Sequence, residues 1–315
     1  MKEAETEYRK LGDSGLKVSE IGLGGNTFGQ RADEATSLAI INRAIDSGIN
    51  FIDTADIYDR GHSEEFVGKA VKGKRSRVII ATKFGNPMGD GPNERGGSRS
   101  YIMKAVEASL KRLQTDYIDL YQIHMVDPTT PIEETLRALD DLVRGGKVRY
   151  IGCSNFAAWQ LCEALWTSRL NNLHSFVSVQ PRYNMLDREI EAELVPCCQA
   201  YNIGVIPWGP LAGGFLTGKY RQGEKVPPDA RLSRPMPLYG EVFTEVNWGK
   251  LAKLEAFARE RGHNMGELAI AWLLAKPWIS TVIAGARKVE QVTANIAGAD
   301  WKLTAEEIAE VNTIS

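Results

Sequence analysis

Cysteine and histidine are both scarce in this sequence, and neither forms a site pattern. The chain has 315 residues but only 4 cysteines and 4 histidines. The cysteines contain no CxxC pair, and the histidines form no HxH or HExxH cluster. We therefore expect neither a disulfide framework nor a metal site, and we expect reduced, mostly buried thiols. The cysteines stand at positions 153, 162, 197 and 198, and the histidines at 62, 124, 174 and 263.

The sequence also lacks an excess of charge and a long apolar run. Its formal net charge is −2 and its pI is about 6.2, which gives no electrostatic attraction toward nucleic acid or an anionic membrane. No segment approaches the roughly 18 apolar residues of a membrane span. The N-terminal stretch MKEAETEYRKLG is charged throughout and lacks the apolar region of a signal peptide. We expect a cytoplasmic protein.

What the sequence does contain is an alternation of short β-branched runs with helical patterns. Apolar residues at a 3.6-residue period between the runs predict helices, for example over 34–47 and over 132–145, where Gly145–Gly146 stops the helix. The predicted strands are 20–24, 50–53, 78–83, 118–123, 148–152, 176–180, 204–208 and 279–284.

This alternation predicts an α/β fold, a (β/α)8 TIM barrel formed by a single domain over residues 1–315. Parallel neighbouring strands need long right-handed crossovers, which the intervening helices supply. The length also suits such a barrel. An open doubly wound sheet usually carries GxGxxG after its first strand. GLGGNTFG at 22–29 has a different spacing, and the next helix begins only near residue 33.

Three segments lie outside this alternation. YRKLGDSGLKVSEIG predicts a β-hairpin around a Gly12–Gly15 turn, which would plug the N-terminal face of the barrel. The segments 84–99 and 209–247 are rich in turn-forming residues and follow predicted strands. We therefore expect two long loops on the C-terminal face, where long ordered loops tend to act as lids or binding loops.

Four titratable side chains stand at or near the ends of three consecutive strands. Asp53 ends the second strand with Tyr58 close behind it, Lys83 ends the third, and His124 follows the fourth. Taken singly, each has an ordinary explanation: a turn-capping Asp, a packed Tyr, a solvated Lys and a structural His. Together they are expected at the C-terminal face, where a barrel carries its chemistry.

Lys83 is the residue of this group that would change the chemistry of its neighbours. A semi-buried Asp–Lys pair is costly to place without a role. An ammonium beside a phenol favours the phenolate, so we expect Lys83 to lower the pKa of Tyr58 from about 10. A phenol tuned in this way acts as a general acid near neutral pH. Asp56 has no expected partner, and we interpret it as a loop residue.

Seven segments, in order and at the right spacing, resemble the aldo-keto reductase superfamily, which is related to the β subunits of potassium channels. They cover roughly residues 8–312. The segments are GINFIDTADIY, ATKFG, SLKRLQTDYIDLYQIH, GKVRYIGCSNF, VSVQPRYNML, PLAGGFLTGKY and VIAGARKVEQVTANI. The resemblance implies a (β/α)8 barrel that binds NADPH (NADP+) without a Rossmann fold and reduces an aldehyde or ketone to an alcohol, independently of metal.

The resemblance also implies a catalytic tetrad. It falls on Asp53, Tyr58, Lys83 and His124. Tyr58 would donate a proton to the carbonyl oxygen as hydride arrives, Lys83 held by Asp53 would tune Tyr58, and His124 would orient the carbonyl. These roles agree with the assignment made from the residues themselves.

Cofactor contacts are expected along the same face. Ser154, Asn155 and Gln180 end two adjacent strands and suit a carboxamide, and Trp208 offers a flat surface to the nicotinamide ring. Arg287 near a helix N-terminus suits a 2′-phosphate, which favours NADPH over NADH. Lys219 either adds charge there or is a solvated loop residue. The full expected set is Gly25, Asn26, Thr27, Asp53, Ser154, Asn155, Gln180, Trp208, Gly209, Pro210, Leu211, Gly213, Lys219, Gly285, Ala286, Arg287, Gln291 and Asn295.

Three functions are compatible with these residues. The first is an NADPH-dependent reductase of a small-molecule carbonyl compound, with Phe28, Tyr58 and Phe84 as expected pocket walls. The second is a cofactor-sensing regulatory protein like a potassium-channel β subunit, although only about seven residues precede the hairpin, which argues against an inactivating extension. The third is a cofactor-free barrel isomerase. The substrate and the oligomeric state, including a homo-oligomer, stay open.

Overall fold

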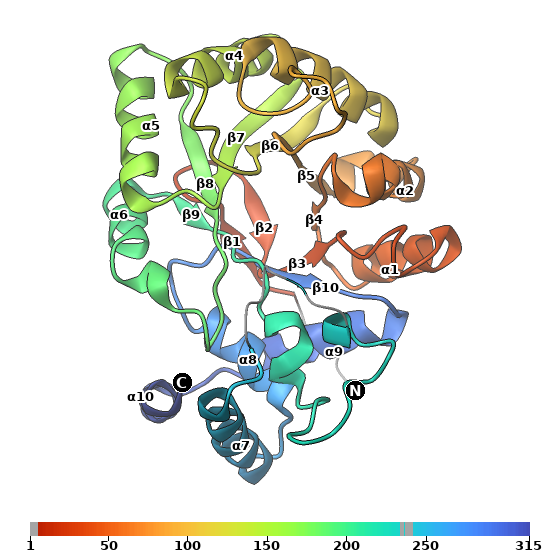
Figure 1. The fold of residues 1–315 in the computed structure, drawn as a ribbon, viewed down its shortest axis with the longest axis vertical. Helices are drawn as coiled ribbons and strands as arrows, with labels where there is room; N and C mark the ends of the chain where they lie inside the picture. The colour runs from red at the N-terminus through yellow and green to blue at the C-terminus, as the bar shows by residue number, and fades with distance from the viewer. Residues whose placement is uncertain (1–5, 234–235, 237–241) are drawn as a thin grey trace.

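The computed structural model describes residues 6–233, 236 and 242–315. Eight parallel strands curl into a barrel in the order β10-β3-β4-β5-β6-β7-β8-β9, with helices outside them (Figure 1). The predicted (β/α)8 architecture is confirmed. The strands are β3 (Ile21–Gly24), β4 (Phe51–Asp53), β5 (Ile79–Phe84), β6 (Ile118–Ile123), β7 (Val148–Ser154), β8 (Phe176–Gln180), β9 (Gly204–Val205) and β10 (Val282–Gly285).

The barrel closes between β9 and β10 through single backbone contacts. Ser280 N donates to Val205 O at 2.9 Å, and Ile283 N donates to Pro207 O at 3.1 Å. The predicted strands 204–208 and 279–284 are therefore too long as regular strands, since only 204–205 and 282–285 are regular. Pro207 has no N–H to continue a ladder. The chain still follows β8, because Trp208 N donates to Pro181 O at 2.9 Å.

The two helices whose first and last residues were predicted begin and end close to the predicted positions. The helix expected over 34–47 runs from Glu34 to Asp46, with the Asp33 side chain accepting from Thr36 N as its N-cap. The helix expected over 132–145 ends at Arg144. The helices are α1 (Glu34–Asp46), α2 (His62–Val71), α3 (Arg99–Leu113), α4 (Ile132–Arg144), α5 (Ala158–Leu170), α6 (Leu194–Tyr201), α7 (Glu245–Glu260), α8 (Met265–Leu274), α9 (Val289–Asp300) and α10 (Ala305–Ile314).

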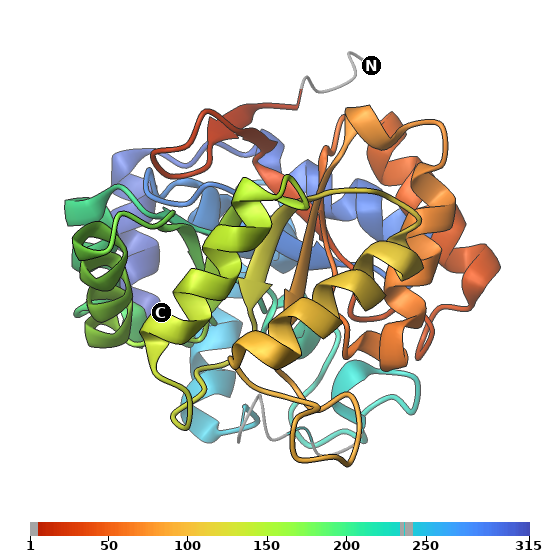
Figure 2. The ribbon, with the colours of Figure 1, turned by 90° about the horizontal axis from the view of Figure 1, so that it is seen from above.

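The predicted hairpin closes the N-terminal end of the barrel. Strands β1 (Tyr8–Lys10) and β2 (Lys17–Ser19) pair antiparallel. Leu11 and Val18 are completely buried and join Phe51 in the cluster inside the barrel. Figure 2 shows the hairpin at one end of the molecule and the two long loops at the other. The hairpin plug is therefore confirmed, and the polar strand ends face the opposite side.

Both long loops lie on the C-terminal side. The loop between β5 and α3 is held at Gly97, whose N–H donates to Asp127 Oδ2 at 2.7 Å. The second loop contains two short 3-10 turns, Ala212–Thr217 and Arg231–Ser233, and α7 begins at Glu245, before the predicted end of the loop. Residues 234–235 and 237–241 of that predicted loop lie outside the described residues.

Within the described residues, none of the helices combines the length and the apolar character needed to cross a membrane. The cytoplasmic location stays a prediction, and so does the single domain over 1–315.

Candidate active site

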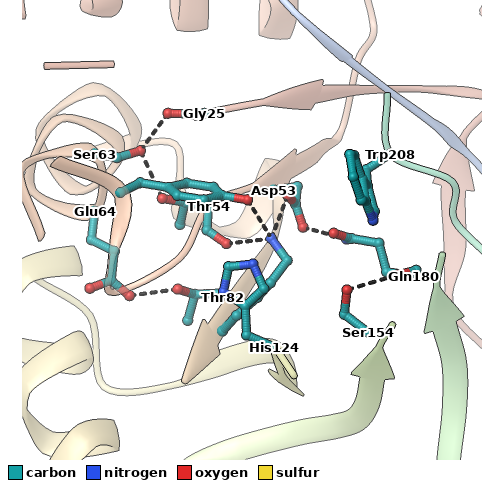
Figure 3. A network of polar contacts seen from close by, with 12 residues as sticks. Gly25, Asp53, Thr54, Ser63, Glu64, Thr82, His124, Ser154, Gln180 and Trp208 are labelled. Atoms are coloured by element: carbon teal, nitrogen blue, oxygen red, sulfur yellow. Dashed lines mark hydrogen bonds and ion pairs between the residues drawn. The ribbon is translucent and has the colours of Figure 1, made fainter. Parts of the chain in front are cut away.

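The four side chains at the strand ends meet around one buried ammonium group. Lys83 is completely buried, and its Nζ donates to Asp53 Oδ1 at 2.6 Å and to Thr54 O at 2.9 Å. The third donor reaches Tyr58 Oη at 3.4 Å. The rings of Tyr58 and His124 meet edge to face, with centroids 5.8 Å apart. Figure 3 shows Asp53, Thr54 and His124 close together in this network. The four residues therefore lie close together, as expected.

Strand register explains how residues distant in sequence meet here. Asp53 ends β4 and pairs with Ala81 of β5. Because side chains alternate along a strand, Lys83 points to the same side as Ala81. Both side chains therefore reach the interior near the C-terminal end. His124 follows β6 directly, and its N–H donates to Phe84 O at 2.8 Å.

Tyr58 is presented by a short, strained turn between β4 and α2. Asp59 and Arg60 have φ values of 47° and 56°, and Gly61 has φ 101°. For residues other than glycine, this left-handed conformation costs about 1–2 kcal/mol each. Such outliers persist only where the surroundings hold them, and they cluster at functional sites.

Burial decides the protonation of the candidate acid. Burial lowers the pKa of Lys83, but Asp53 and Tyr58 raise it by more, so the net pKa lies above its ordinary value. Burial raises the pKa of Tyr58, and the charge of Lys83 lowers it by less. The predicted net lowering of the Tyr58 pKa is therefore wrong, although Lys83 acts in the expected direction. Tyr58 keeps its proton at neutral pH, as a proton donor must.

His124 is neutral. Burial, followed by the nearby charge of Lys83, lowers the pKa of His124 to about 3. Its Nδ1 is buried and has no hydrogen-bond partner among the described residues. A neutral imidazole has one N–H donor and one acceptor nitrogen, so His124 can orient a carbonyl oxygen without adding charge.

Asp56 lies in the loop between β4 and Tyr58, as the sequence suggested, but it is buried and has a partner. Its side chain is 1% exposed, and Oδ2 accepts a long hydrogen bond of 3.4 Å from Tyr101 Oη. Oδ1 has no partner among the described residues. Burial, followed by the charge of Glu64, raises the pKa of Asp56 to about 7. The partner comes from α3, far along the chain, which is why the local sequence did not reveal it.

A second polar layer supports the strand ends from behind (Figure 3). Glu64 is completely buried and accepts from Thr82 Oγ1 and Arg112 Nε, both at 2.6 Å. Ser63 Oγ lies 2.8 Å from Thr54 Oγ1 and donates to Gly25 O at 2.9 Å. These contacts fix α2, which follows Tyr58, against β3 and β5.

The expected carboxamide-binding residues form one connected group. Ser154 and Gln180 end β7 and β8 in register. Ser154 Oγ donates to Gln180 O at 2.7 Å, while Gln180 Nε2 donates to Asp53 Oδ2 at 2.8 Å. Asn155 Oδ1 accepts from Trp208 Nε1 at 3.1 Å. Asn155 Nδ2 donates to Ser154 Oγ at 2.9 Å, so the group links the tetrad to Trp208; Figure 3 shows the contacts of Ser154, Gln180 and Asp53.

The loops after β3 and β10 also meet at this face. Thr27 Oγ1 donates to Ala286 O at 2.6 Å. A side chain at Gly285 would contact Asn26, and one at Gly25 would lie 2.8 Å from Ser63 Oγ. Gly25 therefore has no room for a side chain unless Ser63 moves, whereas at Gly285 the contact would be an ordinary one.

A basic cluster lies beyond the glycine-rich turn that begins at Trp208. Burial, followed by the charges of Arg287, Arg231 and Arg31, lowers the pKa of Lys219. The charge of Asp229 acts on the pKa of Lys219 in the opposite direction. Gly209, Gly213 and neighbouring residues adopt positive φ, and Pro210 and Leu211 lie between them. Arg31 and Arg231 were not expected from the sequence. Their only signal is that both lie in segments leading away from the C-terminal ends of strands.

Arg287, the arginine expected to bind a phosphate, already contacts Asp229 and the start of α9 in this structure. Arg287 Nη2 lies 3.6 Å from Asp229 Oδ2, and its Nη1 donates to Asp229 O. Gln291 Oε1 accepts from Arg287 N at 2.7 Å. Asn295 Nδ2 donates to Gly285 O at 3.4 Å. Gln291 and Asn295 thus bind the turn itself in this structure.

Two expected pocket walls belong to the core instead. Phe28 and Phe84 are both 0% exposed. Phe84 packs on Tyr121 with ring centroids 4.8 Å apart. Of the three aromatic walls named from the sequence, Tyr58 alone is partly exposed.

In the described part of the chain, no group of three or more His, Cys, Asp and Glu side chains is arranged to hold a metal ion.

Comparisons with known proteins agree with this geometry. The family model of the aldo/keto reductase family matches residues 20–315. The aldo-keto reductase YhdN of Bacillus subtilis is 39% identical over 98% of this chain and 93% of its own length. Versiconal hemiacetal acetate reductase of Aspergillus parasiticus is 39% identical over 96% of this chain and 95% of its own.

A further relative has a different name. A probable voltage-gated potassium channel subunit beta of rice (Oryza sativa subsp. japonica) is 36% identical over 98% of this chain and 96% of its own. A barrel with a buried Asp–Lys–Tyr group and a family match over almost the whole chain lead to one conclusion: this protein belongs to the aldo/keto reductase family and is an oxidoreductase.

Proposed function

We propose that this protein reduces an aldehyde or a ketone to an alcohol with NADPH, and that Tyr58 is the proton donor. The contact of Lys83 Nζ with both Asp53 Oδ1 at 2.6 Å and Tyr58 Oη at 3.4 Å carries the proposal. An ammonium buried beside a phenol is placed to stabilise the phenolate that proton donation leaves behind.

The residues divide the proton chemistry among them. When bound, a nicotinamide cofactor supplies the hydride that reaches the carbonyl carbon. Tyr58 Oη gives its proton to the carbonyl oxygen, so the phenol O–H breaks as the alcohol O–H forms. Lys83 Nζ then holds the phenolate, and Asp53 keeps Lys83 charged. Neutral His124 orients the carbonyl oxygen toward Tyr58.

The residues present fit a phosphorylated dinucleotide. Lys219, Arg231, Arg287 and Arg31 supply positive charge for the phosphate groups. The positive-φ glycines keep the backbone amides accessible. Ser154, Asn155 and Gln180 would hold the carboxamide, and Trp208 would stack on the nicotinamide ring.

The test of the proton donor is the Tyr58→Phe variant. A panel of aldehydes, ketones and sugars is reduced with NADPH, and NADPH absorbance is followed. We expect kcat to fall by about 10²–10⁴ because general acid catalysis is lost. Tyr8→Phe, a variant of an exposed tyrosine at the hairpin, is the control and should keep full activity. Full activity in Tyr58→Phe would overturn the assignment.

The cofactor preference is tested at Arg287. We expect a higher kcat/KM with NADPH than with NADH. Arg287→Ala should lower kcat/KM for NADPH by about tenfold to a hundredfold, as for a lost charged hydrogen bond, and leave NADH almost unchanged. Equal efficiencies with the two cofactors in the unmodified protein would contradict the role of Arg287.

A second candidate function follows from the rice relative named as a potassium channel subunit. In this reading the site senses the cofactor and a channel is the partner. Negligible turnover on every carbonyl compound, together with co-purification of a membrane channel, would favour it. Turnover that depends on Tyr58 favours the reductase.

A further inference from the structure

A large cavity lies at the end of the barrel opposite the tetrad. Its volume is about 740 Å³, within the range of roughly 300–1,000 Å³ of small-molecule sites. Its walls come from the hairpin turn, the N-terminal ends of β7 and β8, the last turn of α5, and the segment that links α6 to β9. Since Asp53 and Lys83 lie at the C-terminal strand ends, this cavity is separate from the candidate active site.

Two arginines on its wall have no carboxylate partner among the described residues. The Arg149 guanidinium lies 4.8 Å from the centroid of the Tyr117 ring. The Arg169 guanidinium lies 5.5 Å from the rings of both Trp166 and Tyr201. Stacking on aromatic rings fixes the plane of a guanidinium but leaves its N–H donors available.

The acidic groups near the cavity are already compensated. Asp119 Oδ2 accepts hydrogen bonds from both Arg75 Nη2 at 2.6 Å and Ile80 N at 2.9 Å. Among the described residues, the arginines of this wall that form no ion pair are Arg149 and Arg169, although Arg149 lies near enough to Asp119 to lower the pKa of that carboxyl. The charged pairs at or beside the wall are Asp13–Lys10 at 3.6 Å, Asp119–Arg75 at 2.6 Å and Asp140–Arg144 at 2.5 Å, and Asp140 also forms a hydrogen bond with His174 at 2.6 Å.

The rest of the wall mixes polar and apolar groups. Leu16, Tyr150 and Val177 are its partly exposed apolar side chains, and they pack on the cluster inside the barrel. Leu165 and Phe176 are 4% and 2% exposed, so their packing holds this surface in place. A wall with both apolar surface and polar groups suits an organic molecule rather than a bare ion.

We propose that this cavity binds a small organic anion, whose carboxylate or phosphate group is held by Arg149 and Arg169 and whose apolar body packs on Tyr150 and Val177. The planar fork of arginine matches both headgroups. Since the cavity wall includes the hairpin turn, the ligand joins the hairpin to β7 and β8 and stabilises the folded protein by mass action.

The test uses three probes that share one apolar body. Calorimetric titrations compare 2-naphthoate, 1-naphthyl phosphate and the neutral 2-naphthalenemethanol with the full-length protein. We expect at least one anion to bind about tenfold or more tightly than the alcohol, and to raise Tm. The tighter anion identifies the headgroup. Equal binding of the alcohol, or no binding of either anion up to about 1 mM, would overturn the proposal.

Matched variants locate the binding. Arg149→Met with Arg169→Met should weaken the anion about tenfold or more. Arg77→Met with Arg259→Met removes the same charge from exposed positions elsewhere and should change binding by less than about twofold. An unchanged affinity in the first pair would overturn the proposal. So would loss of binding in Arg287→Met, because the probe would then occupy the opposite face. The comparison with the neutral alcohol needs no variant and stands if the first pair folds poorly.

Discussion

Asp53 and Asp56 are both buried, yet their surroundings differ. Asp53 is 2% exposed and accepts hydrogen bonds from Lys83 and Gln180. Asp56 is 1% exposed, and its one hydrogen bond among the described side chains comes from Tyr101. A carboxylate buried without a cation partner takes up a proton instead. Asp53 therefore forms an ion pair with Lys83, whereas burial raises the pKa of Asp56 to about 7.

The raised pKa of Asp56 predicts a pH-dependent stability. Its pKa is about 7 in the folded chain against 3.8 for the free group. Such a carboxyl stabilises the fold below the lower value, and this contribution is lost as pH rises through the higher one. We expect the unfolding free energy of the natural protein to fall relative to Asp56→Asn between about pH 4 and pH 7, by a few kcal/mol. Urea unfolding at a series of pH values measures it.

The groups that face Asp56 are Glu64, Arg112, Tyr101 and Tyr121. None of them is removed in Asp56→Asn, so their titration is common to both proteins. Asp116→Asn, at an exposed position, is the control and should show no trend. A stability difference between the natural protein and Asp56→Asn that does not change with pH would mean that Asp56 is ionised in the fold.

At the level of elements, the strand ends could be predicted and the loop contacts could not. Parallel strands bring their carboxyl ends to one face, so the positions of Asp53, Lys83 and His124 follow from the alternation alone. Arg31 and Arg231 lie in loops without any periodicity, and their proximity depends on the path of the chain. The two closing strands were predicted too long, because Val205 and Ile279 form an isolated bridge rather than a ladder.

The loop that carries Asp229 competes for the proposed phosphate site. The Asp229 side chain is 74% exposed and lies 3.6 Å from Arg287. An exposed pair of this kind contributes about 0–1 kcal/mol. In Asp229→Asn this competitor is removed, so we expect the Kd for NADPH to fall by up to about fivefold. Quenching of protein fluorescence on NADPH addition measures the Kd.

A control from the same loop separates this effect from a general loss of negative charge. Glu224→Gln removes one exposed carboxylate that has no ion pair among the described residues. It should leave the Kd almost unchanged. Weaker NADPH binding in Asp229→Asn would show instead that Asp229 helps to hold the loop in its binding position.

At the scale of the whole molecule, the two ends of the barrel differ in the side chains that they carry. The C-terminal end gathers charged side chains around Lys83, while the N-terminal end is sealed by Leu11 and Val18 of the hairpin. The seal is tight at Gly12, where φ is 55° and a Cβ would lie 2.3 Å from Val177 O and 2.7 Å from Gly204 N. Both neighbours are backbone atoms of the barrel, so they cannot move aside as a flexible side chain can.

Gly12→Ala therefore tests whether the hairpin stabilises the barrel. We expect the unfolding free energy to fall by about 2 kcal/mol or more, because the left-handed conformation and the backbone clash add up. Gly15→Ala is the matched control in the same turn: no atom lies within 4 Å of the added Cβ, and the change should stay within about 0.5 kcal/mol. Urea unfolding measures both. Because the tetrad lies at the other end, kcat should survive in the folded fraction of Gly12→Ala. Equal unfolding free energies of the two variants would mean that the turn does not pack tightly against β8 and β9, and that the hairpin does not stabilise the barrel.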